Sequence, residues 1–257
     1  MLHALTHHWR AYLLEALGLM AFMLGAGAFG TLFMYPASPV AQAIPSDLLK
    51  RTGLGASMGL VTFAIVTAIG GKTGAHINPA VTLAFWWQGK IRWWDVIFYN
   101  VAQFVGACLA PVLLLAAIGS PFAHGTVRYA TSQPRADGTG IAFAAEFAIS
   151  YALMLVILFV LDSKRIAPAL PAIVGAMIAL FITFESPLSG MSMNPARSFG
   201  SALTAGEWNG MWLYFAAPIA GMLLAVETHR LFRAVVRRAG GAFEETAPHY
   251  PSEQARA

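Results

Sequence analysis

The tripeptide Asn-Pro-Ala occurs twice in this chain, as Asn78-Pro79-Ala80 and as Asn194-Pro195-Ala196, and both copies lie within strongly apolar sequence. Asparagine is a preferred helix N-cap and proline is preformed for the first helical position, so each tripeptide predicts the start of a helix. A helix N-terminus presents unpaired N–H donors and a partial positive charge of roughly +0.5. Two such ends facing one another inside a bilayer would create a polar spot with a positive potential. That chemistry suits the passage of neutral solutes and the repulsion of cations.

The composition indicates a membrane protein, because 58% of the 257 residues are hydrophobic and only 11% are charged. A soluble domain carries about 25% charged residues. Several apolar stretches approach the roughly 20 residues that cross a bilayer, and the shorter ones fit inside a helical bundle. The six stretches cover residues 12–35, 54–69, 94–118, 142–161, 169–183 and 212–228. We therefore expect an all-α membrane protein with six transmembrane helices.

The net charge of +4 is explained by membrane topology, because the basic residues follow the connections between the apolar stretches. With both termini in the cytoplasm, the inner side holds ten of them: Arg10, Lys72, Lys90, Arg92, Lys164, Arg165, Arg230, Arg233, Arg237 and Arg238. The outer side holds Lys50, Arg51, Arg128 and Arg135. We expect a protein of the bacterial inner membrane with cytoplasmic termini and no nucleic-acid partner.

The two halves of the chain repeat one pattern, which predicts a single channel domain over residues 1–240 and a polar cytoplasmic tail over 241–257. Repeat one covers about 10–120 and repeat two about 141–235. Glu15 opens the first span of one repeat and Glu146 that of the other. Three spans per repeat is an odd number, so the second repeat enters from the opposite side, giving an inverted repeat. Each Asn-Pro-Ala precedes about ten helix-compatible residues, which predicts two half-helices, over 81–90 and 197–207. The segments 70–74 and 186–193 before the motifs are expected to be non-helical and to line a watery path.

Taken together, these residues resemble the major intrinsic protein family, the aquaporins and aquaglyceroporins, over about residues 10–235, and we expect a bacterial-type member with an atypical filter. The motif segments are His76-Ile77-Asn78-Pro79-Ala80-Val81-Thr82 and Ser192-Met193-Asn194-Pro195-Ala196-Arg197-Ser198, and Ala102-Gln103-Phe104-Val105-Gly106 adds to the match. The resemblance implies an hourglass pore formed by six helices and two half-helices, and a homotetramer in the lipid bilayer. It also implies a passive channel, which is not an enzyme and needs no cofactor and no metal.

The resemblance assigns roles to residues along the pore. Asn78 and Asn194 become amide donors at the midplane, with N–H groups left free for solute. Arg197 is placed at the outer constriction, where its permanent charge and fixed donors face the pore. Counting from the two motifs puts Met58, Ile182 and Met191 at the other constriction positions, although Glu185 or the loop before Met191 could shift that register.

Three polar residues within the apolar stretches or beside the motifs are open to more than one interpretation. Glu15 and Glu146 could relay protons, because intramembrane carboxylates are often functional. We favour the alternative that each accepts hydrogen bonds from the loop before a half-helix and fixes its shape. His76 could sense pH, and we favour a pore-lining or loop-fixing imidazole.

The constriction residues match neither common pattern of the family. Water channels have an aromatic residue, a histidine and a small residue beside the arginine, and glycerol channels have two aromatics and a glycine. Other positions are closer to water channels: Ser198, Ala202, Tyr214 and Phe215. We expect a passive channel for water and small uncharged solutes, with glycerol, urea or neutral metalloid hydroxides as possible cargo. The alternatives are a secondary transporter and a water-only channel.

Overall fold

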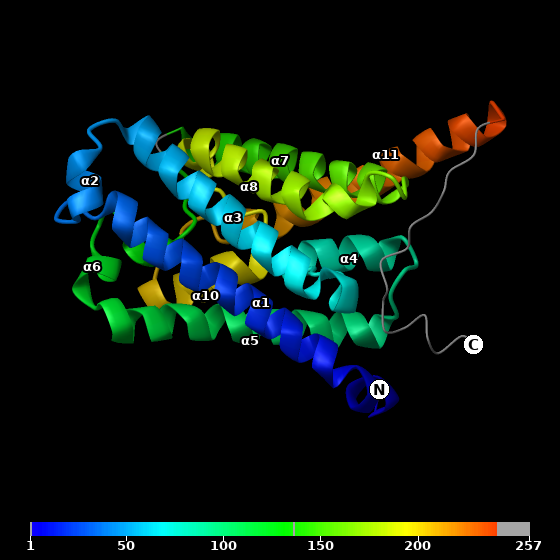
Figure 1. Cartoon of the computed structure of the whole chain (residues 1–257), viewed down its shortest axis with the longest axis horizontal. Coiled ribbons are helices and arrows are strands. Elements are labelled where there is room, and N and C mark those ends of the chain that lie inside the picture. The colour runs from blue at the N-terminus through cyan, green and yellow to red at the C-terminus, as the bar shows by residue number, and fades with distance from the viewer. Residues whose placement is uncertain (1, 136, 241–257) are drawn as a thin grey trace.

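The computed structural model describes residues 2–135 and 137–240, and all regular structure within them is helical. Five helices are long and apolar enough to cross a membrane. They are α1 (Leu2–Met34), α3 (Asp47–Thr73), α5 (Trp93–Ile118), α7 (Gly138–Leu161) and α8 (Leu170–Phe184), the last extended by the 3-10 turn η2 (Ala167–Ala169). A sixth long helix, α11 (Leu213–Arg238), packs along α7 (Figure 1). The prediction of an all-α membrane fold is confirmed.

Three predicted boundaries were wrong, because helices continue past the apolar stretches. α1 begins at Leu2 instead of residue 12, and its first turns are tied to α5 where Nδ1 of His8 lies 2.7 Å from Oδ1 of Asp95. α11 continues to Arg238 instead of residue 228. α3 runs through the glycines at 70 and 71 and ends at Thr73, where Gly74 adopts a left-handed φ of 84° that L-residues rarely adopt.

The two half-helices are α4 (Pro79–Trp87) and α10 (Pro195–Ala205), and each begins at the proline of an Asn-Pro-Ala motif. They start two residues before the predicted ranges, because the asparagine is the extended N-cap and the proline takes the first helical position. The connections contain short helices, among them one turn in the segment predicted to be non-helical at 186–193. These are α2 (Pro39–Ala43), α6 (Ser120–Ala123), η1 (Arg128–Ala130) and α9 (Ser186–Ser189).

The halves of the chain interlock in a reciprocal manner. Half-helix α4 packs against α11 of the second half, and half-helix α10 packs against α5 of the first half (Figure 1). The long helices pair as α1 with α5, α7 with α11, and α3 with α8. Each half-helix is therefore held by a long helix of the other half, which brings both Asn-Pro-Ala motifs to the middle of the bundle.

Small residues permit the closest helix crossings. Gly55 and Gly59 of α3 meet Gly175 and Ala179 of α8, and a Cβ built on Gly59 would lie 2.6 Å from the carbonyl oxygen of Gly175. Small residues four apart are a common device of membrane helices, because they let two backbones approach. The crossing of α3 and α8 brings together two of the four constriction positions, since one lies on each helix.

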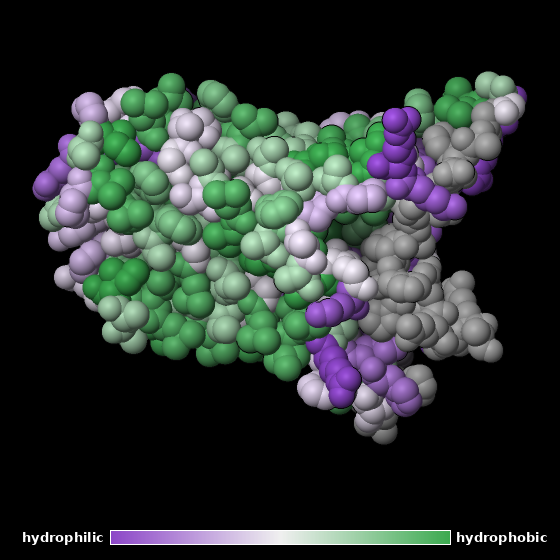
Figure 2. Space-filling model, viewed as in Figure 1, coloured by the Kyte–Doolittle hydropathy of each residue, from purple (hydrophilic) through white to green (hydrophobic). Residues whose placement is uncertain are grey.

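The surface of the bundle is that of a membrane protein. Figure 2 shows apolar side chains over the middle of the visible face and hydrophilic ones at its two ends. Several large apolar side chains have half or more of their surface exposed: Leu60, Val101, Val105, Leu109, Val112, Leu180 and Phe184. Exposed tryptophans stand near helix ends at Trp9, Trp93, Trp94, Trp208 and Trp212, the depth at which membrane proteins place them. We call the end of the bundle that holds Leu2 and Arg238 the terminal side.

Candidate functional site

The two motif asparagines cap the two half-helices. Oδ1 of Asn78 accepts a hydrogen bond from the backbone N–H of Ala80 at 2.9 Å. Oδ1 of Asn194 accepts from the N–H groups of Ala196 at 3.1 Å and Arg197 at 3.2 Å. Both asparagines are buried, and their side-chain oxygens accept hydrogen bonds from the first N–H groups of α4 and α10. This is the N-cap geometry that the tripeptides predict.

The same side chains join the two motif loops to each other. The motif loops are residues 73–78 and 189–194, which lead into the two half-helices. Nδ2 of Asn78 donates to the carbonyl oxygen of Met193 at 2.7 Å, and Nδ2 of Asn194 donates to that of Ile77 at 2.8 Å. A primary amide carries two N–H groups, so this cross-tie uses one and leaves one for another acceptor. The expectation that the N–H groups would be left free for solute was therefore wrong for one N–H of each asparagine.

Glu15 accepts four hydrogen bonds at the centre of the first motif loop, and none of its surface is exposed. Oε1 accepts from the Thr73 hydroxyl at 2.6 Å and the His76 N–H at 3.0 Å. Oε2 accepts from the Ile77 N–H at 2.6 Å and from Nε2 of Gln103 at 2.9 Å. With all its neighbours donating, this carboxylate is a fixed acceptor that holds the loop entering α4.

Glu146 does the same for the second motif loop, at equivalent positions. Oε1 accepts from the Ser189 hydroxyl at 2.6 Å and the Ser192 N–H at 2.7 Å, and Oε2 accepts from the Met193 N–H at 2.7 Å. Ser189 stands five residues before its asparagine, as Thr73 does before the other. These contacts favour the loop-fixing interpretation of both glutamates over proton relay.

The backbone that the glutamates hold is strained. Ala75 and Ile77 have φ of 47° and 40°, and Met191 and Met193 have φ of 49° and 55°. The left-handed region costs an L-residue about 1–2 kcal/mol, so such residues persist only where their surroundings hold them. The strained residues lie three and one positions before each asparagine. Their carbonyls and N–H groups are thereby turned away from helical partners and toward the cross-ties and the buried carboxylates.

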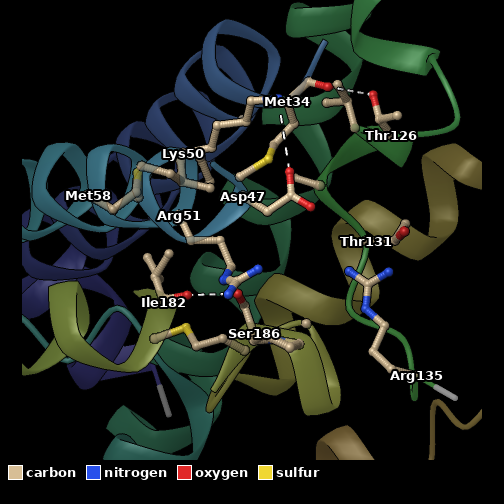
Figure 3. Close-up of a pocket in the computed structure, with 18 of the residues that line it drawn as sticks. Met34, Asp47, Lys50, Arg51, Met58, Thr126, Thr131, Arg135, Ile182 and Ser186 are labelled. Atoms are coloured by element: carbon tan, nitrogen blue, oxygen red, sulfur yellow. Dashed lines mark hydrogen bonds and ion pairs between the residues drawn. The ribbon is translucent and has the colours of Figure 1, made fainter. Parts of the chain in front are cut away.

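The four predicted constriction residues line one cavity of about 560 Å³, which we call the filter cavity (Figure 3). Met58 comes from α3, Ile182 from α8, Met191 from the second motif loop and Arg197 from α10. All four are buried. Three of the four walls are therefore apolar, and Arg197 is the one cation among them.

Arg197 is held by a segment that the sequence pattern did not single out. Its Nη1 contacts the hydroxyl of Ser132, and the Ser198 hydroxyl donates to Ser132 at 2.9 Å. Ser132 belongs to the extended stretch between η1 and α7, more than sixty residues from Arg197 in sequence. Nothing in its local sequence marks it as a pore residue, because its role depends on how the loop folds over the bundle.

Further cations line the filter cavity beside Arg197. Lys50 and Arg51 come from the start of α3 and Arg135 from the stretch before α7, whereas Asp47 is the one acidic residue among the described lining residues. In Figure 3, the Arg51 side chain ends beside Ser186, and its Nε donates to the carbonyl oxygen of Thr183 at 3.1 Å. A hollow lined by charges of one sign attracts anions and repels cations.

A second cavity of about 350 Å³ adjoins the first, since Phe22 and Met191 line both. Asn78, Asn194 and His76 face it from the motif loops. Apolar side chains form another part of its lining: Leu153, Ile157, Val174 and Ile178. The cavity therefore has a polar part for hydrogen-bonding solutes and an apolar part that offers no competing partner.

His76 lines this second cavity and is also fixed in place. Its Nδ1 lies 3.1 Å from the Thr82 hydroxyl, and its ring stacks on Phe85 with a centroid distance of 4.9 Å. Both favoured roles of the imidazole, pore-lining and loop-fixing, fit this position. Across the described part of the chain, no group of three or more histidine, cysteine or acidic side chains is placed to hold a metal ion.

The comparison with protein families identifies this architecture. The model described as "Major intrinsic protein" matches residues 3–229. The chain belongs to the major intrinsic protein family. It is an integral membrane protein and a passive channel for water and small uncharged solutes, not an enzyme.

Sequence relatives in the major intrinsic protein family include plant channels. Aquaporin NIP1-2 of Oryza sativa subsp. japonica is 34% identical over 231 residues, which cover 89% of this chain and 75% of the relative. Aquaporin NIP6-1 of Arabidopsis thaliana is 35% identical over 214 residues, covering 82% of this chain and 68% of the relative. These relatives do not support the expectation of a bacterial-type member.

A solved structure of the family shares the fold. The aquaglyceroporin from Plasmodium falciparum superposes with a TM-score of 0.76, covering 90% of this chain and 99% of that chain. Sequence identity is 19%, so this likeness bears on the fold alone.

Proposed function

We propose that this channel passes water together with slightly larger uncharged solutes, of which glycerol, urea and neutral metalloid hydroxides are the candidates. The observation that carries the proposal is the filter cavity, where three of the four predicted constriction residues are apolar, Met58, Ile182 and Met191, and the fourth is Arg197. Thioether side chains adapt their shape, so two of the walls can yield to a solute wider than water.

The same residues set what is excluded. With few donors at the filter, water still moves in single file, because waters bond to one another. A bare ion has no ring of carboxylates or carbonyls to replace its hydration shell. The cations Lys50, Arg51, Arg135 and Arg197 add a positive potential that opposes other cations. A secondary transporter would need ionisable coupling residues facing the path. Among the described residues that line the second cavity, His76 is the one ionisable side chain, and Thr82 and Phe85 hold its ring in place.

Sidedness and assembly complete the proposal. Basic side chains gather at the terminal side, including Arg230, Arg233 and Arg237, so we assign that side to the cytoplasm and the filter cavity to the exterior. Exposed apolar side chains on the long helices offer faces for a homotetramer within the bilayer. The relatives described above are plant proteins, so the bacterial inner membrane stays a prediction from the sequence. The proposed cytoplasmic tail, 241–257, lies outside the described residues.

The test measures water, glycerol and urea fluxes in proteoliposomes carrying the wild type and two filter variants. Ile182→His adds a donor opposite Arg197 and narrows the opening, so glycerol flux should fall while water flux persists. Arg197→Val should admit larger solutes and leave a partial cation leak, because the half-helix ends keep part of the barrier. Ile182→Val is the matched apolar control and should keep the wild-type preference. A wild type that passes only water, with no change in Ile182→His, would refute the proposal. Strong temperature dependence with gradient coupling would indicate a transporter instead.

A further inference from the structure

A buried hydroxyl in the second motif loop lies between two carboxyl groups. Oγ of Ser189 is 2.6 Å from Oε1 of Glu146 and 2.5 Å from Oε1 of Glu185. The same hydroxyl accepts a hydrogen bond from the N–H of Met191 at 3.0 Å. Glu185 directly follows the last residue of α8 and is 7% exposed.

If both glutamates were ionised, the single hydrogen of the Ser189 hydroxyl would have to serve two short contacts, so one contact would lack a hydrogen. A serine hydroxyl carries one hydrogen and so can donate to one oxygen at a time. Glu146 is the acceptor of that hydrogen, because its oxygens also accept the N–H groups of Ser192 and Met193. The contact between Glu185 and Ser189 therefore needs a hydrogen on Glu185, which donates it to the hydroxyl.

The second oxygen of Glu185 supports the same assignment. Oε2 is buried and has no hydrogen-bond partner among the described residues. An ionised carboxylate with an unpaired buried oxygen is costly, whereas a neutral carboxyl group tolerates that position better.

The first motif loop has no counterpart of Glu185, so the second carboxyl group is an addition to what the two loops share. There the Thr73 hydroxyl serves a single carboxylate, Glu15. Glu185 stands nine residues before Asn194, and the residue nine before Asn78 is Ile69, which is apolar. The second acidic group is thus present only in the loop that carries the filter residue Met191.

We propose that Glu185 is a positioning residue of the filter: its neutral carboxyl group donates to Ser189 and holds the loop at Met191, and loss of its proton loosens that loop and lowers flux. The inference rests on the proposed role of the filter cavity as the constriction. With both carboxyl groups charged, two carboxylates would compete for one hydroxyl hydrogen and repel each other at close range. Met191, whose N–H is bound to that hydroxyl and whose backbone is strained, would lose its support.

The surrounding charges set the pH range of this switch. Burial, and next the neighbouring charge of Glu146, raise the pKa of Glu185 to about 8. The hydrogen bond with Ser189, the charge of Arg197 and the N–H of Met191 oppose that rise more weakly. The charged or titratable groups around the cluster are Glu146 on α7, Arg197 on α10, Tyr214 on α11, Arg51 on α3 and Arg135 before α7. A raised pKa means that the neutral, supporting form prevails below about pH 8 and is lost above it.

The experiment measures water flux into proteoliposomes while the external pH is varied at constant internal pH. Wild-type flux should fall by about twofold or more between about pH 6.5 and pH 9.5, since a carboxyl group with a pKa near 8 changes from mostly neutral to mostly charged over that range. Glu185→Gln keeps a neutral donor to Ser189 and should show a flat profile near the low-pH flux. Glu185→Leu, which also lacks the titrating group, should be flat too and serves if the first variant assembles poorly.

Glu227→Gln is the matched control, because Glu227 is a carboxylate with an exposed side chain on α11 and lines neither cavity. This variant should keep the wild-type profile. A flat wild-type profile overturns the inference, and so does a wild-type profile in Glu185→Gln. Glycerol flux at about pH 6.5 tests the proposed solute range separately. The pH profile of water flux tests the role of Glu185, so the two claims can fail independently.

Discussion

Replacing Glu15 by glutamine tests how much the first motif loop depends on its buried carboxylate. The change is nearly isosteric, so it alters hydrogen bonding without creating a cavity. The carboxylate accepts four hydrogen bonds, two at each oxygen, from Thr73, His76, Ile77 and Gln103. Glutamine keeps one accepting oxygen and replaces the other with a donating NH₂ group.

The cost can be worked out from these contacts. If the NH₂ group faces Ile77, the amide of Gln103 can turn to offer its unpaired oxygen, but the Ile77 N–H loses its acceptor. If it faces His76, the Thr73 hydroxyl can rotate, but the His76 N–H loses its acceptor. A buried unsatisfied N–H costs about 1–3 kcal/mol, and each remaining bond loses about 1 kcal/mol of charge assistance. Two bonds remain on the amide oxygen, so we expect a loss of about 3–5 kcal/mol in either orientation.

The measurements are water flux in proteoliposomes and the melting temperature of the purified channel in detergent. Both should fall in Glu15→Gln, because the strained Ile77 would no longer be held and its cross-tie to Asn194 would weaken. Glu227→Gln is the control: this carboxylate is exposed on α11, where ion pairs contribute little. Wild-type flux and melting temperature in Glu15→Gln would refute the bracing argument.

Three further substitutions probe packing, the second loop and the half-helix caps. Gly106→Val should abolish folded, monodisperse protein in size-exclusion chromatography, because a Cβ there collides with the backbone oxygen of Ala16; normal assembly would contradict the packing. Tyr214→Phe removes the hydroxyl that donates to the Ser189 carbonyl at 2.5 Å, so it should cost about 1 kcal/mol in thermal unfolding while flux persists. Asn78→Ala removes the cap of α4 and one cross-tie, which should cost about 1–2 kcal/mol and reduce water flux; unchanged flux would show that this amide is not part of the path.

The apolar stretches and the two Asn-Pro-Ala motifs allowed most of the architecture to be predicted from the sequence. Long apolar segments must be helical in a bilayer, because each backbone N–H and C=O has to be satisfied within its own segment. Asparagine and proline mark helix starts by local chemistry, so the starts of α4 and α10 were predicted to within two residues of those observed. The paired glutamates, Glu15 and Glu146, were recognised because each repeat carries one at the same place.

The helix lengths were predicted less well. α1 and α11 extend into the water on the terminal side, where hydropathy carries no signal and contacts such as His8 with Asp95 decide whether a turn continues. The glycines at 70 and 71 suggested a break, yet α3 packs against its neighbours and continues to Thr73. Tertiary packing outweighed the low helix propensity of glycine, which costs only about 1 kcal/mol per residue.

The surroundings of the filter were decided by tertiary structure alone. The contact of Ser132 with Arg197, the position of Arg135 and the approach of Glu146 to the Glu185–Ser189 pair all depend on which segments meet around the half-helices. Periodicity and capping signals are local, and they hold no information about a contact between residues sixty positions apart. The sequence by itself determined a six-helix channel with two capped half-helices. Only the fold decided which side chains hold the filter, because that depends on side-chain contacts among α3, α8, α10 and the stretch before α7.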